Sequence, residues 1–168
     1  MARYEGYWNP ELPYLDKVTF RFIPDPNAQT AALKAGDVDL IGWLFAPELA
    51  ADIAKDKRFK VNAGASTSEV IMSTNNKAKP FDNLKVRQAM AHAIDRKMII
   101  DLAMSGYGTP IGSHWSPAAP YYVDLVGTYP YDPEKAKKLL AEAGYPNGFD
   151  AVLKVPGKYA YSVRAGEV

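Results

Sequence analysis

The chain has 168 residues, of which 48% are hydrophobic and 23% charged, and its formal net charge is +1. This composition is typical of a globular chain and excludes disordered and fibrous classes. The near-neutral charge offers no basic face to nucleic acid, and the absence of cysteine excludes disulfides, thiolate zinc sites and cysteine nucleophiles.

The first half of the sequence predicts an α/β arrangement of alternating strands and helices. Short runs of alternating polar and apolar residues are typical of strands, whereas an Asp-Pro start and a closing glycine are typical of a helix. Because a strand, a helix and a second strand follow one another directly, a βαβ unit is expected. The expected strands are residues 17–23, 39–42, 59–62 and 69–74, and the expected helices are residues 26–35 and 47–55.

The second half changes to helical spacing of its apolar residues. Residues 83–105 are expected to form one kinked helix or two consecutive helices, with Asp82 capping the start and Asp95 capping a second run. Asp132 is expected to cap a further helix, which Gly144 ends. An ordered loop rich in Gly, Pro and Tyr, a strand and the start of a last helix are expected at residues 106–131, 151–155 and 161–168.

The helical patterns also predict which side chains are buried. After residue 83, Val86, Met90, Ala93 and Ile94 share an apolar face, whereas His92 lies on the opposite, polar face. His92 is therefore predicted to be a solvated surface histidine. The apolar faces expected for the first helix and for the helix after Asp132 are Ala28, Ala31, Ala32 and Ala35, and Ala136, Leu139, Leu140 and Ala143.

The sequence offers little for catalysis. Its two histidines are His92 and His114, and no motif for phosphate, dinucleotide, calcium or zinc binding occurs. His114 and Trp115 lie in a Gly/Pro-rich loop where ligand contacts concentrate, although this loop could instead pack on the protein. Trp43 follows the second expected strand and either lines a binding crevice or covers the core. No catalytic residue, metal site or cofactor is expected.

Three segments of the chain carry recognisable motifs in a fixed order. Residues 7–40 contain the aromatic pair YW, the run PYLDKV and the run AALKAGDVDL. Residues 75–96 contain an asparagine pair followed by PFDNLKVRQAMAHAIDR, and residues 106–145 contain GYGTP and YDPEKAKKLLAEAGY. Together they resemble the type-5 extracytoplasmic solute-binding family, which includes the dipeptide-, oligopeptide- and nickel-binding subunits of ABC importers.

The resemblance implies an α/β fold of the two-lobed periplasmic-binding-protein kind (type II, cluster C-like), in which helices flank a mixed sheet. Such proteins close on their ligand like a hinge. Residues 1–74 would be part of the first lobe, residues 75–82 a crossing segment near the hinge, and residues 83–168 the beginning of the second lobe. Because no export signal precedes these residues and the helix after Tyr161 has no closing signal, the chain is expected to be an interior piece of a longer protein.

The resemblance also implies a function without catalysis. A substrate-binding subunit of an ABC importer captures a peptide or a similar small polar solute and delivers it to permease subunits, in the periplasm or otherwise outside the cytoplasm at the membrane. The residues expected to face the solute, from their approximate position, are Trp43, Asn75, His114 and Trp115.

The resemblance leaves the ligand open among dipeptides, oligopeptides, nickel chelates, glycans and opines. The near-neutral charge indicates no nucleic acid partner. A partial lobe would expose apolar surface, so self-association of the chain is also expected. Two rival interpretations are a free-standing structural or interaction domain that self-associates, and a hydrolase that uses His114.

Overall fold

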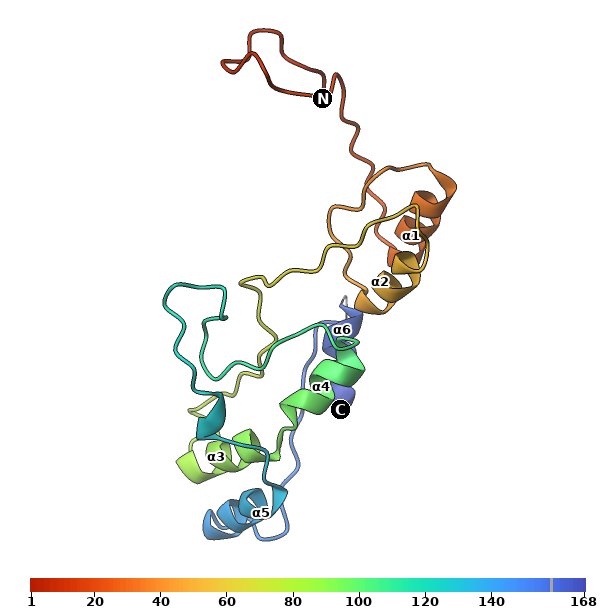
Figure 1. The fold of residues 1–168 in the computed structure, drawn as a ribbon. Coiled ribbons are helices and arrows are strands. Elements are labelled where there is room, and N and C mark those ends of the chain that lie inside the picture. Colours follow the sequence, from red (N-terminus) through yellow and green to blue (C-terminus); the bar gives the residue numbers. More distant parts are fainter. Residues whose placement is uncertain (158) are drawn as a thin grey trace. The chain divides into compact units, whose positions relative to one another are not determined.

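The structure is a computed structural model that describes residues 1–157 and 159–168 (Figure 1). The described residues form six α-helices and one 3-10 helix, and the chain divides into two compact units, Met1–Leu44 and Phe45–Val168. The helices are α1 (Pro26–Ala35), α2 (Pro47–Ala54), α3 (Leu84–Ala93), α4 (Arg96–Ala103), η1 (Val126–Thr128), α5 (Pro133–Glu142) and α6 (Ala160–Glu167).

The helix of the first unit, α1, begins and ends as the sequence predicts. The carboxylate of Asp25 accepts a hydrogen bond of 2.7 Å from a backbone N–H of the first turn, and Gly36 ends the helix with a φ of +81°. The buried side chains are Thr30 and Leu33 rather than the predicted alanine stripe. Burial of Leu33 is favoured because a leucine buries more apolar surface than an alanine. Thr30 can be buried because its hydroxyl keeps a hydrogen bond, which it donates to the Pro26 carbonyl at 2.9 Å.

The strands predicted from alternation are not formed. In the described part of the chain the β pairing is limited to an isolated antiparallel bridge between Ala2 and Lys17. Alternation predicts an extended backbone, but a strand also needs a neighbour that pairs its N–H and C=O groups. The expected mixed sheet is therefore not confirmed. The segments that lie outside any strand are residues 17–23, 39–42, 59–62, 69–74 and 151–155.

The helical stretch after residue 83 is two helices, α3 and α4, which is one of the two predicted alternatives. Asp95 caps α4 as expected, because its carboxylate accepts a hydrogen bond of 3.0 Å from an N–H of the first turn. The cap of α3 is Asn83, whose side-chain oxygen accepts from the Lys85 N–H at 2.9 Å, and not the predicted Asp82. Asparagine and aspartate cap helices equally well, so the sequence alone did not distinguish these neighbours.

His92 is buried, with 1% of its surface exposed, so the prediction of a surface histidine is wrong. Its Nδ1–H donates to the Pro130 carbonyl at 2.7 Å, and its ring meets the Tyr129 ring edge-on with centroids 5.5 Å apart. The His92 carbonyl also accepts from the Asp132 N–H at 2.8 Å. Conversely Ala93, placed by its spacing on the buried face, is exposed. A histidine can be buried when its ring N–H has a hydrogen-bond acceptor. The helical spacing of apolar residues does not reveal such an acceptor.

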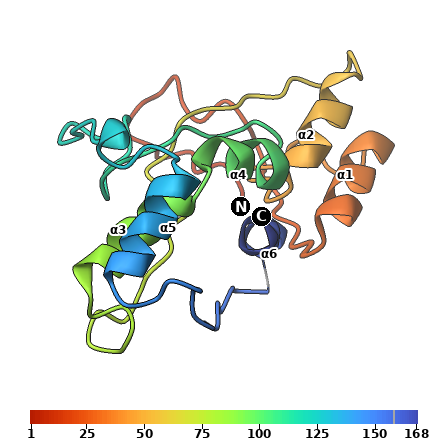
Figure 2. The ribbon, with the colours of Figure 1, turned by 90° about the horizontal axis from the view of Figure 1, so that it is seen from below.

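Helices α3 and α5 lie side by side (Figure 2). α5 is capped by Asp132, whose carboxylate accepts from the Lys135 N–H at 2.9 Å. It ends at Gly144, which has a φ of +92° and donates to a carbonyl of the last turn at 3.0 Å, as the sequence predicts. The buried side chains of the two helices are Val86, Ala89, His92 and Ala136.

The other helices of the second unit are α2, α4 and α6. α4 packs beside α6, and Arg164 of α6 donates to the Glu48 carboxylate of α2 at 3.0 Å. Phe45 lies just before α2 and Tyr159 just before α6, and the centroids of their rings are 5.9 Å apart. The predicted helices at residues 47–55 and 161–168 are confirmed to within one residue at each end.

An ion pair joins α3 to the end of α5 and makes stability depend on pH. Lys85 Nζ lies 2.9 Å from Glu142 Oε2, and this hydrogen bond, with the charge of the ammonium group, lowers the pKa of the Glu142 carboxyl. Because the pKa falls on folding, the stabilisation is present above the ordinary glutamate pKa of about 4.3 and is lost as the pH falls through the folded value.

We therefore expect Glu142→Gln to lower the melting temperature slightly at neutral pH and by less at about pH 3, since the pair is at the surface. Thermal melts at the two pH values check this. Lys85→Met should cause the same loss, and the double variant should lose no more than either single variant. An equal loss at both pH values would contradict the ion-pair interpretation.

Candidate functional site

The candidate site is built on residues 112–125, which we call the aromatic loop. Its ends are held together at Gly112, where a Cβ atom would lie 2.2 Å from the carbonyl carbon of Leu125 and 2.4 Å from the nitrogen of Val126. Only glycine permits this backbone contact. A weaker second link is the hydrogen bond of 3.4 Å from the Ser113 hydroxyl to the Val123 carbonyl. We call this contact of Gly112 with Leu125 and Val126 the closed neck of the loop. It restrains the side chains of the loop, which no helix or strand holds in place.

Two aromatic rings of the loop contact each other. Trp115 and Tyr121 meet edge-to-face with ring centroids 5.8 Å apart, and 52% and 72% of their surfaces are exposed. Between them the Ala119 N–H donates to the carbonyl of the buried Ser116 at 2.8 Å, which makes the turn that brings the rings together. An aromatic pair of this kind can pack against the apolar parts of a solute. The indole N–H and the phenol O–H can form hydrogen bonds with the polar parts of the same solute.

The phenol of Tyr122 lies in the same loop and stays protonated at neutral pH. Its pKa is raised above the ordinary tyrosine value chiefly by loss of hydration, and also by the nearby carboxylate of Asp124. The Asp124 side chain in turn accepts from the Val126 N–H at 3.0 Å. This local turn stabilises the end of the aromatic loop next to Val126.

His114 links the aromatic loop to an extended segment that is distant in sequence. Its Nδ1 lies 3.4 Å from Oε2 of Glu69, which is at the start of residues 69–74. The imidazole is 82% exposed, whereas the Glu69 side chain is only 16% exposed. The pair combines an accessible ring nitrogen with a shielded carboxylate, so it can both donate to and accept from a polar solute.

Asn75 lies near the carboxyl end of the same extended segment and is exposed. Its side-chain oxygen accepts from the Lys77 N–H at 3.1 Å, and its carbonyl accepts from the Ala78 N–H at 3.0 Å. The amide NH₂ is therefore the part of Asn75 that can pair with a solute. Within the described residues no hydrogen bond joins Asn75 to His114 or Trp115.

Trp43 is the one predicted site residue of the first unit. It is 60% exposed and follows the extended residues 39–42, as the sequence indicates. The structure thus brings His114 and Trp115 together on one loop, places Asn75 in the same unit and leaves Trp43 in the other unit.

Sequence reasoning missed two members of this arrangement, Glu69 and Tyr121. Glu69 is isolated in an extended segment and its partner is 45 residues away, so no spacing pattern could reveal it. Tyr121 is one of several tyrosines in the region of residues 106–131, and nothing in the sequence distinguishes it from the others. The Ser113 hydroxyl, which neighbours His114 in sequence, donates to a backbone carbonyl of the loop instead.

The part of the chain that the structure describes contains no cluster of three or more His, Cys, Asp or Glu side chains suited to a metal ion. Among the same residues, no helix has the length and apolar character that crossing a membrane requires.

Comparisons with known proteins identify the family. The sequence matches the bacterial extracellular solute-binding proteins, family 5 Middle, over residues 1–168. It is 40% identical over 153 residues to the glutathione-binding protein GsiB of Escherichia coli O1:K1 and 39% identical over 153 residues to that of Escherichia coli strain K12. Each alignment covers 91% of this chain and 30% of the relative.

A solved structure shows the same likeness in three dimensions. The PBP AgaA in complex with agropinic acid, from A. tumefaciens R10, is similar with a TM-score of 0.71 and 33% identity, over 99% of this chain and 34% of that chain. The chain spans about a third of the length of these proteins. The periplasmic-binding-protein part of the predicted fold is thereby confirmed, although its mixed sheet is not. The chain belongs to family 5 of the bacterial extracellular solute-binding proteins.

Proposed function

We propose that the chain is part of the substrate-binding subunit of an ABC-type importer. The subunit captures a peptide or a similar small polar solute outside the cytoplasm and delivers it to a membrane permease. The observation that carries the proposal is the aromatic loop of a solute-binding family member, whose closed neck presents Trp115, Tyr121 and His114 to solvent. The side chains of Trp115, Tyr121 and His114 are exposed and are not part of the buried core.

The chemistry of the loop supports a solute with both apolar and polar parts. The rings of Trp115 and Tyr121 offer contact area, while His114 and Glu69 offer a donor and an acceptor. The relatives are named for glutathione, which is itself a small peptide, and the similar solved structure holds agropinic acid. A small polar organic solute is the class that these names share.

The proposed organisation is that residues 1–74 belong to one lobe, residues 75–82 cross between lobes and residues 83–168 belong to the other. Periplasmic binding proteins close on their solute like a hinge, and we propose that Trp43, Asn75, His114 and Trp115 contact it. Hinge closure of this kind excludes water around the ligand and so strengthens its polar contacts.

A thermal-shift panel on the protein as its gene encodes it tests the proposal. Glutathione, dipeptides, oligopeptides, opines, glycans and nickel chelates are the solutes to compare. A solute that binds the folded state stabilises it by about 2.7 kcal/mol at a hundred times its Kd. We expect at least one of them to raise the melting temperature in proportion to the logarithm of its concentration. No rise with any of them would contradict the proposal.

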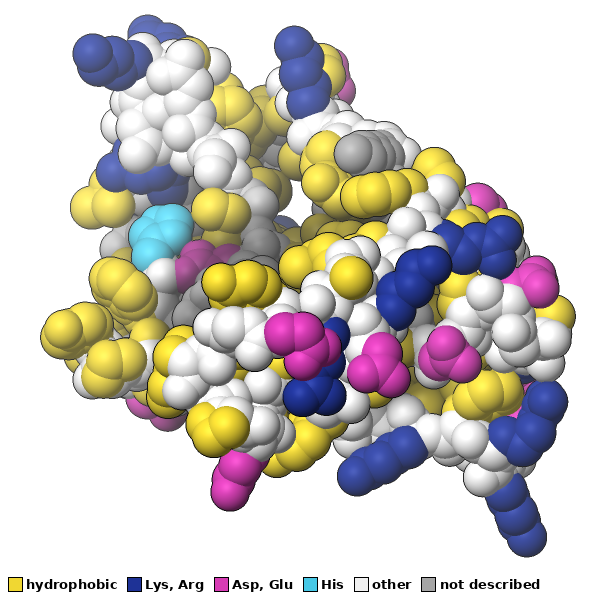
Figure 3. Space-filling model, turned by 90° about the horizontal axis from the view of Figure 1, so that it is seen from above, with side chains coloured by type: hydrophobic (Ala, Val, Ile, Leu, Met, Phe, Trp, Pro, Cys, Tyr) yellow, Lys and Arg dark blue, Asp and Glu magenta, His cyan; other side chains and the backbone are white. Residues whose placement is uncertain are grey.

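A second function, self-association as a structural domain, is favoured by one observation. Large apolar side chains of the extended segments are exposed, and Figure 3 shows hydrophobic side chains at several places on one face. Exposed unpaired segments tend to pair with another chain. A molecular mass in solution that rises with concentration would support this function, and a constant monomer mass would exclude it. The exposed residues include Phe20, Phe22, Leu40, Val70, Ile71 and Met72.

A further inference from the structure

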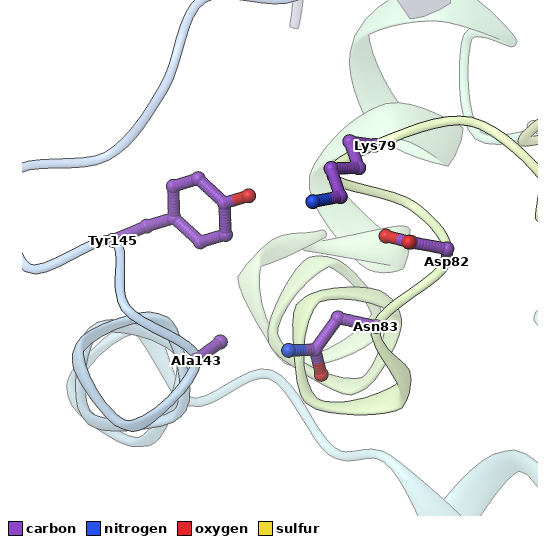
Figure 4. Close-up of a pocket in the computed structure, with 5 residues that line it drawn as sticks. All are labelled: Lys79, Asp82, Asn83, Ala143 and Tyr145. Carbon is purple, nitrogen blue, oxygen red and sulfur yellow. The ribbon is translucent and has the colours of Figure 1, made fainter.

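A pocket that shares no residue with the aromatic loop lies between the start of α3 and the end of α5. It is an open cavity of about 380 Å³ lined by Lys79, Asp82, Asn83, Ala143 and Tyr145 (Figure 4). Four of the five residues are polar, and one carries a positive and one a negative charge. The lining therefore suits a small polar ligand rather than an apolar one.

The walls of the pocket are fixed by contacts behind them. On one side, Arg87 donates to the carbonyls of Phe81 and Asp82 at 2.8 and 3.2 Å, which holds the turn before α3. On the other side, the ring of Tyr145 meets Phe149 edge-on at 5.4 Å, and Phe149 meets Phe81 at 5.9 Å. These contacts join the two walls, so the pocket does not need to form when a ligand arrives.

The ion pair between α3 and α5 also stabilises the position of the two pocket walls. Lys85 Nζ and Glu142 Oε2, 2.9 Å apart, connect the first turn of one helix with the last turn of the other. Because these two charges neutralise each other, the charges of the pocket that remain for a ligand are those of Lys79 and Asp82.

Three hydrogen-bond donors converge on the cavity. The Lys79 ammonium group and the Tyr145 hydroxyl point towards each other across it (Figure 4). The Asn83 oxygen is engaged by the Lys85 N–H at 2.9 Å, so its NH₂ group is turned to the cavity, as Figure 4 shows. The Asp82 carboxylate lies beside them as an acceptor. Donors from both walls, with a carboxylate on the wall before α3, complement a molecule with a carboxylate and an ammonium group close together.

We propose that this pocket binds the zwitterionic head group of an amino acid. The ligand carboxylate pairs with Lys79, Asn83 and Tyr145, and its ammonium group pairs with Asp82. A dianion such as phosphate can pair with Lys79 but not with Asp82, and a simple cation can pair with Asp82 but not with Lys79, so neither pairs both charges of the pocket. The cavity is larger than the head group, so side chains of several kinds fit. The proposal does not depend on the proposed transport function.

Equilibrium dialysis on the protein as its gene encodes it tests the pocket with isotopically labelled glycine. Acetate and methylammonium serve as the two halves of the same zwitterion. Glycine is expected to bind saturably and about tenfold more tightly than either half, because each half leaves one charge of the pocket unpaired. Lys79→Gln should weaken glycine binding about tenfold. Asp82→Asn should remove the preference for glycine over acetate.

Two control variants locate the binding. Lys77→Gln removes an exposed lysine that does not line the cavity, and Trp115→Ala removes the main ring of the aromatic loop; both should leave the glycine Kd unchanged. Loss of glycine binding in Trp115→Ala would assign it to the aromatic loop and overturn the proposal. Equal binding of glycine and acetate by the unmodified protein, or no saturable glycine binding up to about 50 mM, would also overturn it.

Discussion

Replacing His92 by alanine is expected to destabilise the second unit by about 3 kcal/mol, although the sequence pattern places this histidine at the surface. The variant leaves a cavity beside the Tyr129 ring, and it deprives the Pro130 carbonyl of a donor at 2.7 Å. Urea unfolding should show a lower midpoint with an unchanged slope, because the variant changes stability and not the surface exposed on unfolding.

The matched control is His114→Ala, which removes the other histidine of the chain. Its imidazole is 82% exposed, so the free energy of unfolding should change by less than about 0.5 kcal/mol. If both variants unfold at the same urea concentration as the unmodified chain, the burial of His92 is wrong.

Replacing Gly112 by alanine is expected to open the neck of the aromatic loop. The added Cβ would lie 2.2 Å from the carbonyl carbon of Leu125, which is backbone and cannot move aside as a flexible side chain would. Relief of this overlap needs a backbone shift, and such overpacking costs about 1–3 kcal/mol. The shift also displaces Trp115 and His114, so affinity for the solute of the proposed function should fall about tenfold or more.

The control for this variant is Gly127→Ala, since a Cβ at Gly127 meets no atom within 4 Å. Thermal melts and solute titrations of the two variants, measured together, separate the effect of the neck from that of a general Gly→Ala exchange. A Gly112→Ala variant that matches the Gly127→Ala variant in both measurements would show that the neck is not tightly closed.

The helices of this chain could be predicted because their ends depend on local chemistry. The Asp-Pro starts at Asp25 and Asp132 and the closing glycines Gly36 and Gly144 lie within one or two residues of their hydrogen-bond partners. Burial could be predicted less well, because it depends on which face meets another element. Of the face predicted for α5, Ala136 is buried, whereas Leu139, Leu140 and Ala143 are only partly buried. The buried face of α3 is displaced towards His92.

The strands and half of the candidate site could not be predicted, for the same physical reason. A strand requires hydrogen bonds with a neighbouring strand, and the alternation of polar and apolar residues does not say which segment that neighbour is. Likewise, Glu69 and His114 are 45 residues apart, and no sequence pattern links them. His114 and Trp115 could be chosen as candidates because Gly and Pro mark an ordered loop, which is a local signal. The choice of Trp43 and Asn75 remains a prediction, as do the lobe boundaries.

The most direct test of the proposed function is a calorimetric titration of the protein, as its gene encodes it, with the most stabilising solute of the thermal-shift panel. The unmodified protein should bind one solute saturably, and Trp115→Ala should bind it about tenfold to a hundredfold more weakly. Tyr131→Ala, which removes another half-exposed ring of the second unit, should bind it with unchanged affinity. Unchanged affinity in Trp115→Ala, or no saturable binding of any solute by the unmodified protein, would contradict the account.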